Sequence, residues 1–298
     1  MRNALFAVAP VALVLGGLAA TRDDVRPRTP STVAEAQARD CLNRGPTPLG
    51  APVTDAERAA VPNATRGNAF VSIGSRRSVV IIDLATGERT TLDAGVANAH
   101  EVAVSPDGKW GVVADIGGYT GDYNFDGNRL AVFDLAAKRL ARVIDLGQYI
   151  GPHDLVFTTP NTLLVTTQTT QHVVEVNVAT GEILGATETR SKGAHTLAVS
   201  VDGRMAFTAN QPEGTFSVLD IAQRRFIAKH KVRDGEAEGI FFVTADGREV
   251  WLGFEEPGEV RVVRVADGAP IATLPGFRIP NRMTISRDGR SADHGLWL

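Results

Sequence analysis

Cysteine is nearly absent from this chain of 298 residues. The single cysteine, Cys41, cannot form a disulfide within the chain. It lies well past the apolar N-terminal run, unlike the cysteine of a lipoprotein, and no Cys-x-x-Cys-His motif for haem attachment is present. We interpret Cys41 as an incidental thiol, and internal disulfides are excluded as a source of stability.

A cluster of basic residues is also missing. The chain has 31 Lys and Arg residues against 34 Asp and Glu, for a net charge of −3, with no basic cluster. Nucleic acid is therefore not expected as a partner. A nucleophile elbow, a glycine-rich phosphate loop and an ordered Ser-His-Asp set are absent as well. No catalytic class is indicated by a motif.

Only one long apolar run is present, Ala4–Leu18, preceded by Arg2 and followed by small residues. This pattern predicts a secretory signal peptide over residues 1–20. The alternative is a membrane anchor, but the run is short for a span and contains Pro10. We expect a periplasmic or secreted protein without stable membrane insertion. Residues 21–66 are rich in Pro, Ala, Arg and Asp and predict an irregular leader.

The most informative feature that is present is a repeat of about 43 residues. Each copy opens with a polar residue before a short apolar strand, and successive openings are 53, 42, 43 and 43 residues apart. The five openings are His100, His153, His195, Glu238 and Asn281. Repeats of this length with several short strands are typical of a β-propeller, in which each repeat is one four-stranded antiparallel blade. We therefore predict an all-β propeller over residues 67–298.

The strand and turn signals divide the repeat region into blades. Asp-Gly turns, as in Asp107-Gly108 and Asp202-Gly203, close hairpins between alternating strands. The sequence holds one three-strand piece, four full blades and a terminal strand or two. Two explanations stay open. The strand expected at 282–286 completes the N-terminal piece and closes a five-bladed ring, or the chain is a truncated form of a longer propeller.

The repeat openings resemble those of one family. The segments that carry the resemblance are Pro152-His153-Asp154-Leu155, Ala194-His195-Thr196-Leu197, Ala237-Glu238-Gly239-Ile240 and Ser105-Pro106-Asp107-Gly108. They are similar to the openings and turns of the YncE-like, YVTN-repeat β-propellers, which are exported bacterial proteins usually of seven blades. The resemblance covers about residues 67–290. Related blades occur in quinoprotein amine dehydrogenase-like and haem d1-type propellers, so the resemblance implies architecture and compartment more firmly than chemistry.

In a propeller the linker into the first strand and the loop between the second and third strands share one face. The five opening residues are therefore expected around the mouth of a central channel. Three imidazoles and a carboxylate suit a transition metal, so one hypothesis is that His100, His153, His195 and Glu238 are metal ligands. Two alternatives remain: each opening residue caps its own strand, or the set lines a pocket for a small polar molecule.

An insert at 117–128 accounts for the one long interval between openings. Its Asp122, Asn124 and Asp126 match the start of a calcium loop, although Phe133 stands where the closing carboxylate belongs. An ordinary turn, in which Asp, Asn and Gly are common, accounts for the same residues. The insert also supplies three aromatic residues that are expected to form a lid or ligand-stacking wall, namely Tyr119, Tyr123 and Phe125.

The function predicted from these features is that of an exported, non-catalytic propeller. It is expected to bind a small molecule, a metal ion or a protein partner at the channel mouth, with a transition metal or calcium as the possible cofactor. One alternative is a periplasmic enzyme, lactonase-like or a quinoprotein-type oxidoreductase, that uses the same channel. Another is a purely structural interaction scaffold.

Overall fold

The computed structural model describes residues 67–298 except 245, 278–279, 281, 286–291 and 296–298. The predicted signal peptide at 1–20, the predicted leader at 21–66 and Asn281 lie outside the described residues. Among the residues that are described, the only helices are two short 3-10 segments, η1 (Gly74–Arg76) and η2 (Gln211–Glu213). Within that part of the chain, no helix has the length and apolar character needed to cross a membrane.

The chain forms a series of antiparallel sheets in sequence order. The first sheet has three strands: β1 (Asn68–Ile73), β2 (Ser78–Asp83) and β3 (Arg89–Asp93). The second is β4 (Ala99–Val104), β5 (Trp110–Asp115), β8 (Arg129–Asp134) and β9 (Arg139–Asp145). The third is β10 (Pro152–Phe157), β11 (Thr162–Thr167), β12 (His172–Asn177) and β13 (Glu182–Glu188).

Two further four-stranded sheets follow the same order. The fourth is β14 (Ala194–Val199), β15 (Met205–Asn210), β16 (Thr215–Asp220) and β17 (Arg225–Lys231). The fifth is β18 (Gly239–Val243), β19 (Glu249–Phe254), β20 (Glu259–Arg264) and β21 (Pro270–Pro275). The all-β class and the repeated four-stranded antiparallel sheets are thus confirmed.

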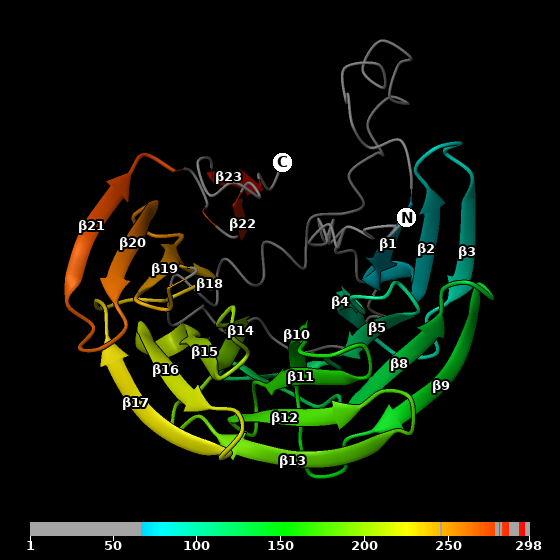
Figure 1. Ribbon diagram of the computed structural model, residues 1–298, viewed down its shortest axis with the longest axis horizontal. Helices are drawn as coiled ribbons and strands as arrows, with labels where there is room; N and C mark the ends of the chain where they lie inside the picture. Colours follow the sequence, from blue (N-terminus) through cyan, green and yellow to red (C-terminus); the bar gives the residue numbers. More distant parts are fainter. Residues whose placement is uncertain (1–66, 245, 278–279, 281, 286–291, 296–298) are drawn as a thin grey trace, which may run out of the picture.

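The five sheets follow one another along an arc (Figure 1). In the four-stranded sheets the first strand lies at the inside of the arc and the fourth at the outside. The C-terminal strand β22 (Arg282–Ile285) pairs with β23 (Ala292–Gly295). No described residue of β22 pairs with β1, so the described pairings do not contain the ring closure that the sequence left open.

A repeated side-chain clasp explains why the sheets turn where the sequence predicts. The hydroxyl of Ser105 donates to Asp107 Oδ1 at 2.6 Å, and the same carboxylate accepts the N–H of Lys109 at 3.1 Å. Equivalent clasps join Ser200 to Asp202 and Thr244 to Asp246, at 2.7 Å in each case. The hydroxyl hydrogen bond lowers the pKa of each of these aspartates. Each clasp fixes the hairpin between the first two strands of its sheet.

The hydrophobic core lies between neighbouring sheets. The third strand β8 is covered on both faces, and its residues 130–133 are apolar and buried. The fourth strands have one solvent face, and in β17 exposed and half-buried residues alternate along the whole strand. The resulting wedge of packed sheets holds the inner strands at fixed positions relative to one another.

Candidate functional site

Each of the three predicted histidines lies in a β-bulge of an inner strand. In β4, Ala99 is paired with Asp115 and Val102 with Val113, so three steps on one strand oppose two on its partner. The same irregularity falls between Pro152 and Leu155 and between Ala194 and Leu197. The sequence placed the histidines directly before their strands. The structure places them inside, because pairing starts at the residue before each histidine and continues through the bulge. Bulges redirect side chains and are frequent next to binding sites.

The bulges bring the three imidazoles, here called the histidine row, into contact across three sheets. The ring centroids of His100 and His153 are 4.5 Å apart, and those of His153 and His195 are 4.0 Å apart. His153 is 2% exposed and His195 is 6% exposed. The structure therefore brings these three predicted site residues together.

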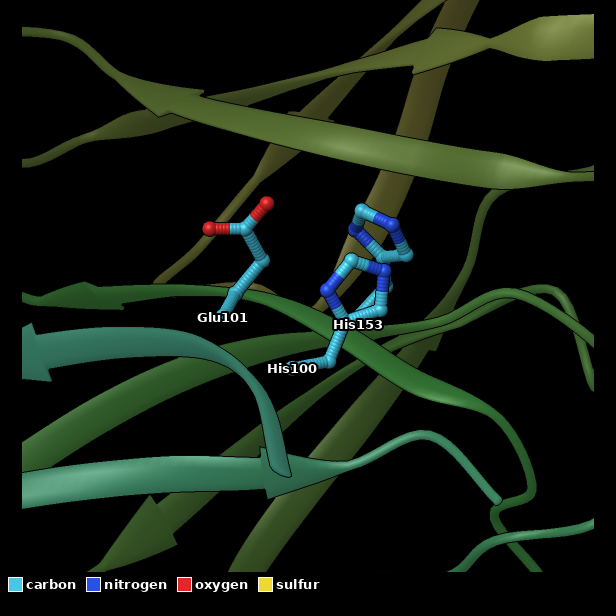
Figure 2. A group of neighbouring side chains, drawn as sticks. All are labelled: His100, Glu101 and His153. Atoms are coloured by element: carbon cyan, nitrogen blue, oxygen red, sulfur yellow. The ribbon is translucent and has the colours of Figure 1, made fainter. Parts of the chain in front are cut away.

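A metal-compatible cluster lies at one end of this row. His100, Glu101 and His153 each offer a ligand atom, and these atoms all lie within 4.8 Å of one another. Figure 2 shows the two imidazoles side by side with the Glu101 carboxylate next to them. Glu101 is buried and was missed by the sequence reasoning, which assigned it to the strand. The available signal was that a second polar residue follows each histidine: Glu101, Asp154 and Thr196.

Glu238, the fourth predicted ligand, lies at the other end of the row. Its carboxylate accepts a hydrogen bond from Gln211 Nε2 at 2.8 Å, and its main-chain carbonyl lies 2.5 Å from His195 Nδ1. Because a carbonyl only accepts, Nδ1 of His195 carries the proton, and in the neutral ring Nε2 keeps its lone pair. Glu238 is not part of the three-residue cluster; it fixes the tautomer of His195 instead.

The inner strands are braced through main-chain carbonyl groups of the row. The Ser72 hydroxyl donates to the carbonyl of His100 at 2.5 Å, and the Thr166 hydroxyl donates to that of His195 at 2.8 Å. Both hydroxyls occupy the same position in strands β1 and β11, one sheet before the histidine. Because the acceptors are carbonyl oxygens, this bracing would be available to any residue type at these openings.

The insert forms a hairpin, the insert hairpin, of β6 (Tyr119–Gly121) and β7 (Asn124–Phe125). Asp122 and Tyr123 have φ of 54° and 62°, as a two-residue hairpin turn of type I′ requires. Asp122 pairs with Lys192, and Asp126 Oδ1 accepts the N–H of Gly118 at 2.6 Å. Both aspartates among the three predicted calcium ligands therefore have protein partners, and the third ligand, Asn124, lies in β7. Calcium binding stays a prediction.

The insert hairpin reaches from the second sheet across the ends of the next three. The N–H of Phe125 donates to Thr169 Oγ1 at 2.7 Å, and that hydroxyl donates back to the Phe125 carbonyl at 2.9 Å. The Tyr123 hydroxyl donates to Glu236, which lies just before β18. Burial, and then the bond to Glu236, raise the pKa of the Tyr123 hydroxyl. The hairpin is thus fixed above loops of the third to fifth sheets.

The three predicted aromatics differ in environment. The rings of Tyr119 and Phe125 pack at a centroid distance of 5.4 Å, and Tyr119 is 46% exposed. Tyr123 and Phe125 are half-buried by the contacts described above.

Comparison of the chain with protein-family models and with curated proteins found no match.

Proposed function

We propose that this chain is an exported β-propeller that binds a transition-metal ion, Zn²⁺ or Cu²⁺, at the mouth of its channel. The cluster of His100, Glu101 and His153, whose ligand atoms lie within 4.8 Å of one another, carries the proposal. The export part of the proposal rests on the apolar segment at residues 1–20, and the propeller part rests on the repeat openings, which resemble those of YVTN-repeat propellers.

A propeller arrangement accounts for the observed sheets. Each is an antiparallel unit in sequence order, and the sheets follow an arc with first strands inside (Figure 1). In a propeller this order brings equivalent residues of successive blades to one face around the axis. The contact between His100, His153 and His195, which are equivalent positions of three blades, is what that geometry predicts.

The donor set suits a borderline metal. Imidazole and carboxylate ligands bind Zn²⁺ at about 2.0 to 2.2 Å, which separates tetrahedral ligand atoms by about 3.4 Å. The cluster's upper limit of 4.8 Å leaves about 1 Å of inward movement, within reach of side-chain rotation. Three protein ligands leave the fourth position open for water, a small molecule or His195, whose Nε2 is held as an acceptor.

Titration of the purified, metal-stripped full chain with Zn²⁺ and Cu²⁺ tests this function. We expect one ion per chain, and a loss of affinity of at least about a hundredfold in His153→Ala and in Glu101→Gln. His172→Ala is the matched control, because His172 lies in β12 and its Nδ1 is engaged with the Thr170 carbonyl at 2.5 Å. This variant is expected to bind like the parent.

Two results would contradict the proposal. The first is the absence of saturable binding in the parent chain. The second is equal affinity in the parent and in His153→Ala, which would place any bound ion elsewhere. Cobalt substitution adds a spectroscopic readout, since tetrahedral Co²⁺ with imidazole and carboxylate ligands gives strong visible bands and a surface-bound ion does not.

A further inference from the structure

A second row of side chains, the amide row, lies beside the histidine row and is formed by Gln168, Gln211 and Glu238. Gln168 Nε2 donates to Gln211 Oε1 at 3.3 Å, and Gln211 Nε2 donates to the Glu238 carboxylate at 2.8 Å. The main chain ties this row to the bulges. The N–H of Gln168 donates to the carbonyl of Gly151, and that of Gln211 to the carbonyl of Gly193, each two residues before a histidine.

The carboxylate at one end sets the direction of the whole row. Because an ionised carboxylate only accepts, Gln211 must present its NH₂ group to Glu238 and therefore its oxygen to Gln168. Gln168 must then present its own NH₂ group to Gln211. The oxygen of Gln168 is left at the far end, where it is buried and has no hydrogen-bond partner among the described residues; Gln168 as a whole is 2% exposed.

A buried amide oxygen without a partner is costly and calls for a donor. The insert hairpin is fixed at both ends of the amide row: Phe125 binds Thr169, the residue after Gln168, and Tyr123 binds Glu236, two residues before Glu238. The row therefore has an acceptor oxygen and the main chain of Phe125 at the Gln168 end, and the acidic residues Glu236 and Glu238 with Tyr123 at the other end. This combination matches a cation that donates hydrogen bonds, which is favoured by carboxylates and by aromatic rings.

We propose that Gln168, with the row that orients it and the insert hairpin above it, forms a subsite for a primary ammonium group. The subsite goes beyond the proposed metal centre and does not use the cluster of His100, Glu101 and His153. An ammonium group supplies N–H donors to the Gln168 oxygen, whereas a quaternary ammonium of the same charge has none.

Binding of butylammonium to the full chain, measured by saturation-transfer NMR and calorimetry, tests the subsite against two matched probes. Butanol lacks the charge, and butyltrimethylammonium lacks the N–H donors. We expect butylammonium to bind about tenfold or more tightly than either probe, since a hydrogen bond to a charged group carries about that factor. Equal binding of butylammonium and butyltrimethylammonium would overturn the proposal.

Three variants locate the binding. Gln168→Met keeps the size of the side chain, removes the amide oxygen and is expected to weaken butylammonium binding about tenfold or more. Glu238→Gln removes the carboxylate that fixes the direction of the row, so the amide groups of Gln168 and Gln211 can both reverse. We expect this variant to stay folded and to bind butylammonium more weakly. Gln223→Met, at an exposed turn after β16, is the control and should bind like the parent. Unchanged binding in Gln168→Met, with thermal unfolding confirming a folded protein, would refute the assignment.

The same measurements on metal-stripped protein separate the two proposals. Butylammonium binding without metal, combined with no Zn²⁺ binding, would contradict the metal centre alone. Zn²⁺ binding without butylammonium binding would contradict the ammonium subsite alone. A crystal structure grown with butylammonium that shows only water at the Gln168 oxygen would also overturn the subsite.

Discussion

Replacing Thr166 with valine tests how the inner strands are joined. Thr166 is fully buried in β11, and its hydroxyl serves two neighbours at once. It accepts the N–H of Asp154 at 2.9 Å, beside the β10 bulge, and donates to the His195 carbonyl in β14 at 2.8 Å. Valine has nearly the same shape, so the substitution removes the hydroxyl and leaves the packing in place.

The expected magnitude follows from these two hydrogen bonds. Each contributes about 1 kcal/mol net, and the main-chain groups left without a partner add a desolvation penalty. We expect Thr166→Val to lower the free energy of unfolding by about 2 to 3 kcal/mol. For a domain of this size that corresponds to a fall in Tm of about 4 to 12 °C. Thermal unfolding followed by circular dichroism measures it.

The control for this prediction is Thr180→Val. Thr180 is exposed, and its hydroxyl only accepts the N–H of Glu182 at 3.2 Å in a turn. A change of less than about 0.5 kcal/mol is expected there. If Thr166→Val and Thr180→Val unfold at the same temperature, the hydroxyl does not join the sheets, and the bracing of the histidine row is wrong.

Three further changes have defined outcomes. A Cβ at Gly127 would overlap the carbonyl oxygen of the residue that ends β5, so Gly127→Ala should cost about 1 to 3 kcal/mol, measured by thermal unfolding. Tyr123→Phe removes the hydrogen bond to Glu236, and amides of the insert hairpin should exchange with deuterium about fivefold faster, at a cost of about 1 kcal/mol. The Ser105 hydroxyl lowers the pKa of Asp107, so the stability from this carboxylate is present above the ordinary value of 3.8 and is lost as the pH falls below it. The Tm difference between parent and Asp107→Asn should therefore be largest near pH 7 and shrink by pH 3, and a difference independent of pH would contradict the clasp.

The sheets and their turns were predictable because their signals are local. Each Asp-Gly turn and each alternating strand is encoded by a segment of about ten residues or fewer. The predicted order of a three-strand piece, four complete sheets and terminal strands is observed. Local hydrogen bonds such as the clasp of Ser105 and Asp107 explain this agreement.

Glu101 could not be found in the same way. In a regular strand neighbouring side chains point to opposite faces, so a strand that presents His100 to the mouth would turn Glu101 away. The bulge in β4 breaks this alternation and brings both residues into one cluster. A bulge is defined by how two strands pair, and sequence alternation within one strand does not reveal it.

The conformation of the insert hairpin could not be predicted either, because it too depends on contacts between distant parts of the chain. The letters around Asp122 resemble a calcium loop, whereas the chain turns at Asp122 and Tyr123, both with positive φ. That conformation is uncommon for tyrosine. The cost of this backbone conformation is offset by two contacts: Asp122 pairs with Lys192, 70 residues further along the chain, and Tyr123 with Glu236, 113 residues further along. Such distant partners leave no signal in the local sequence.

The bracing of the inner strands bears on the choice between capping and binding. The hydroxyls of Ser72 and Thr166 hold the carbonyl oxygens of His100 and His195, and any residue at these positions supplies a carbonyl. Strand capping through the main chain therefore does not require histidine. Imidazoles at three successive openings, in contact with one another and joined by Glu101, need a reason that lies in the side chains. One such reason is the hydrogen bond from His195 Nδ1 to the Glu238 carbonyl of the next sheet. The proposed metal centre supplies a second for His100 and His153, because it depends on the ring nitrogens and on the added carboxylate. If capping through the main chain alone were responsible, His100→Gln and His153→Gln would leave every measured property unchanged; the metal centre requires that they keep the fold and lose the ion.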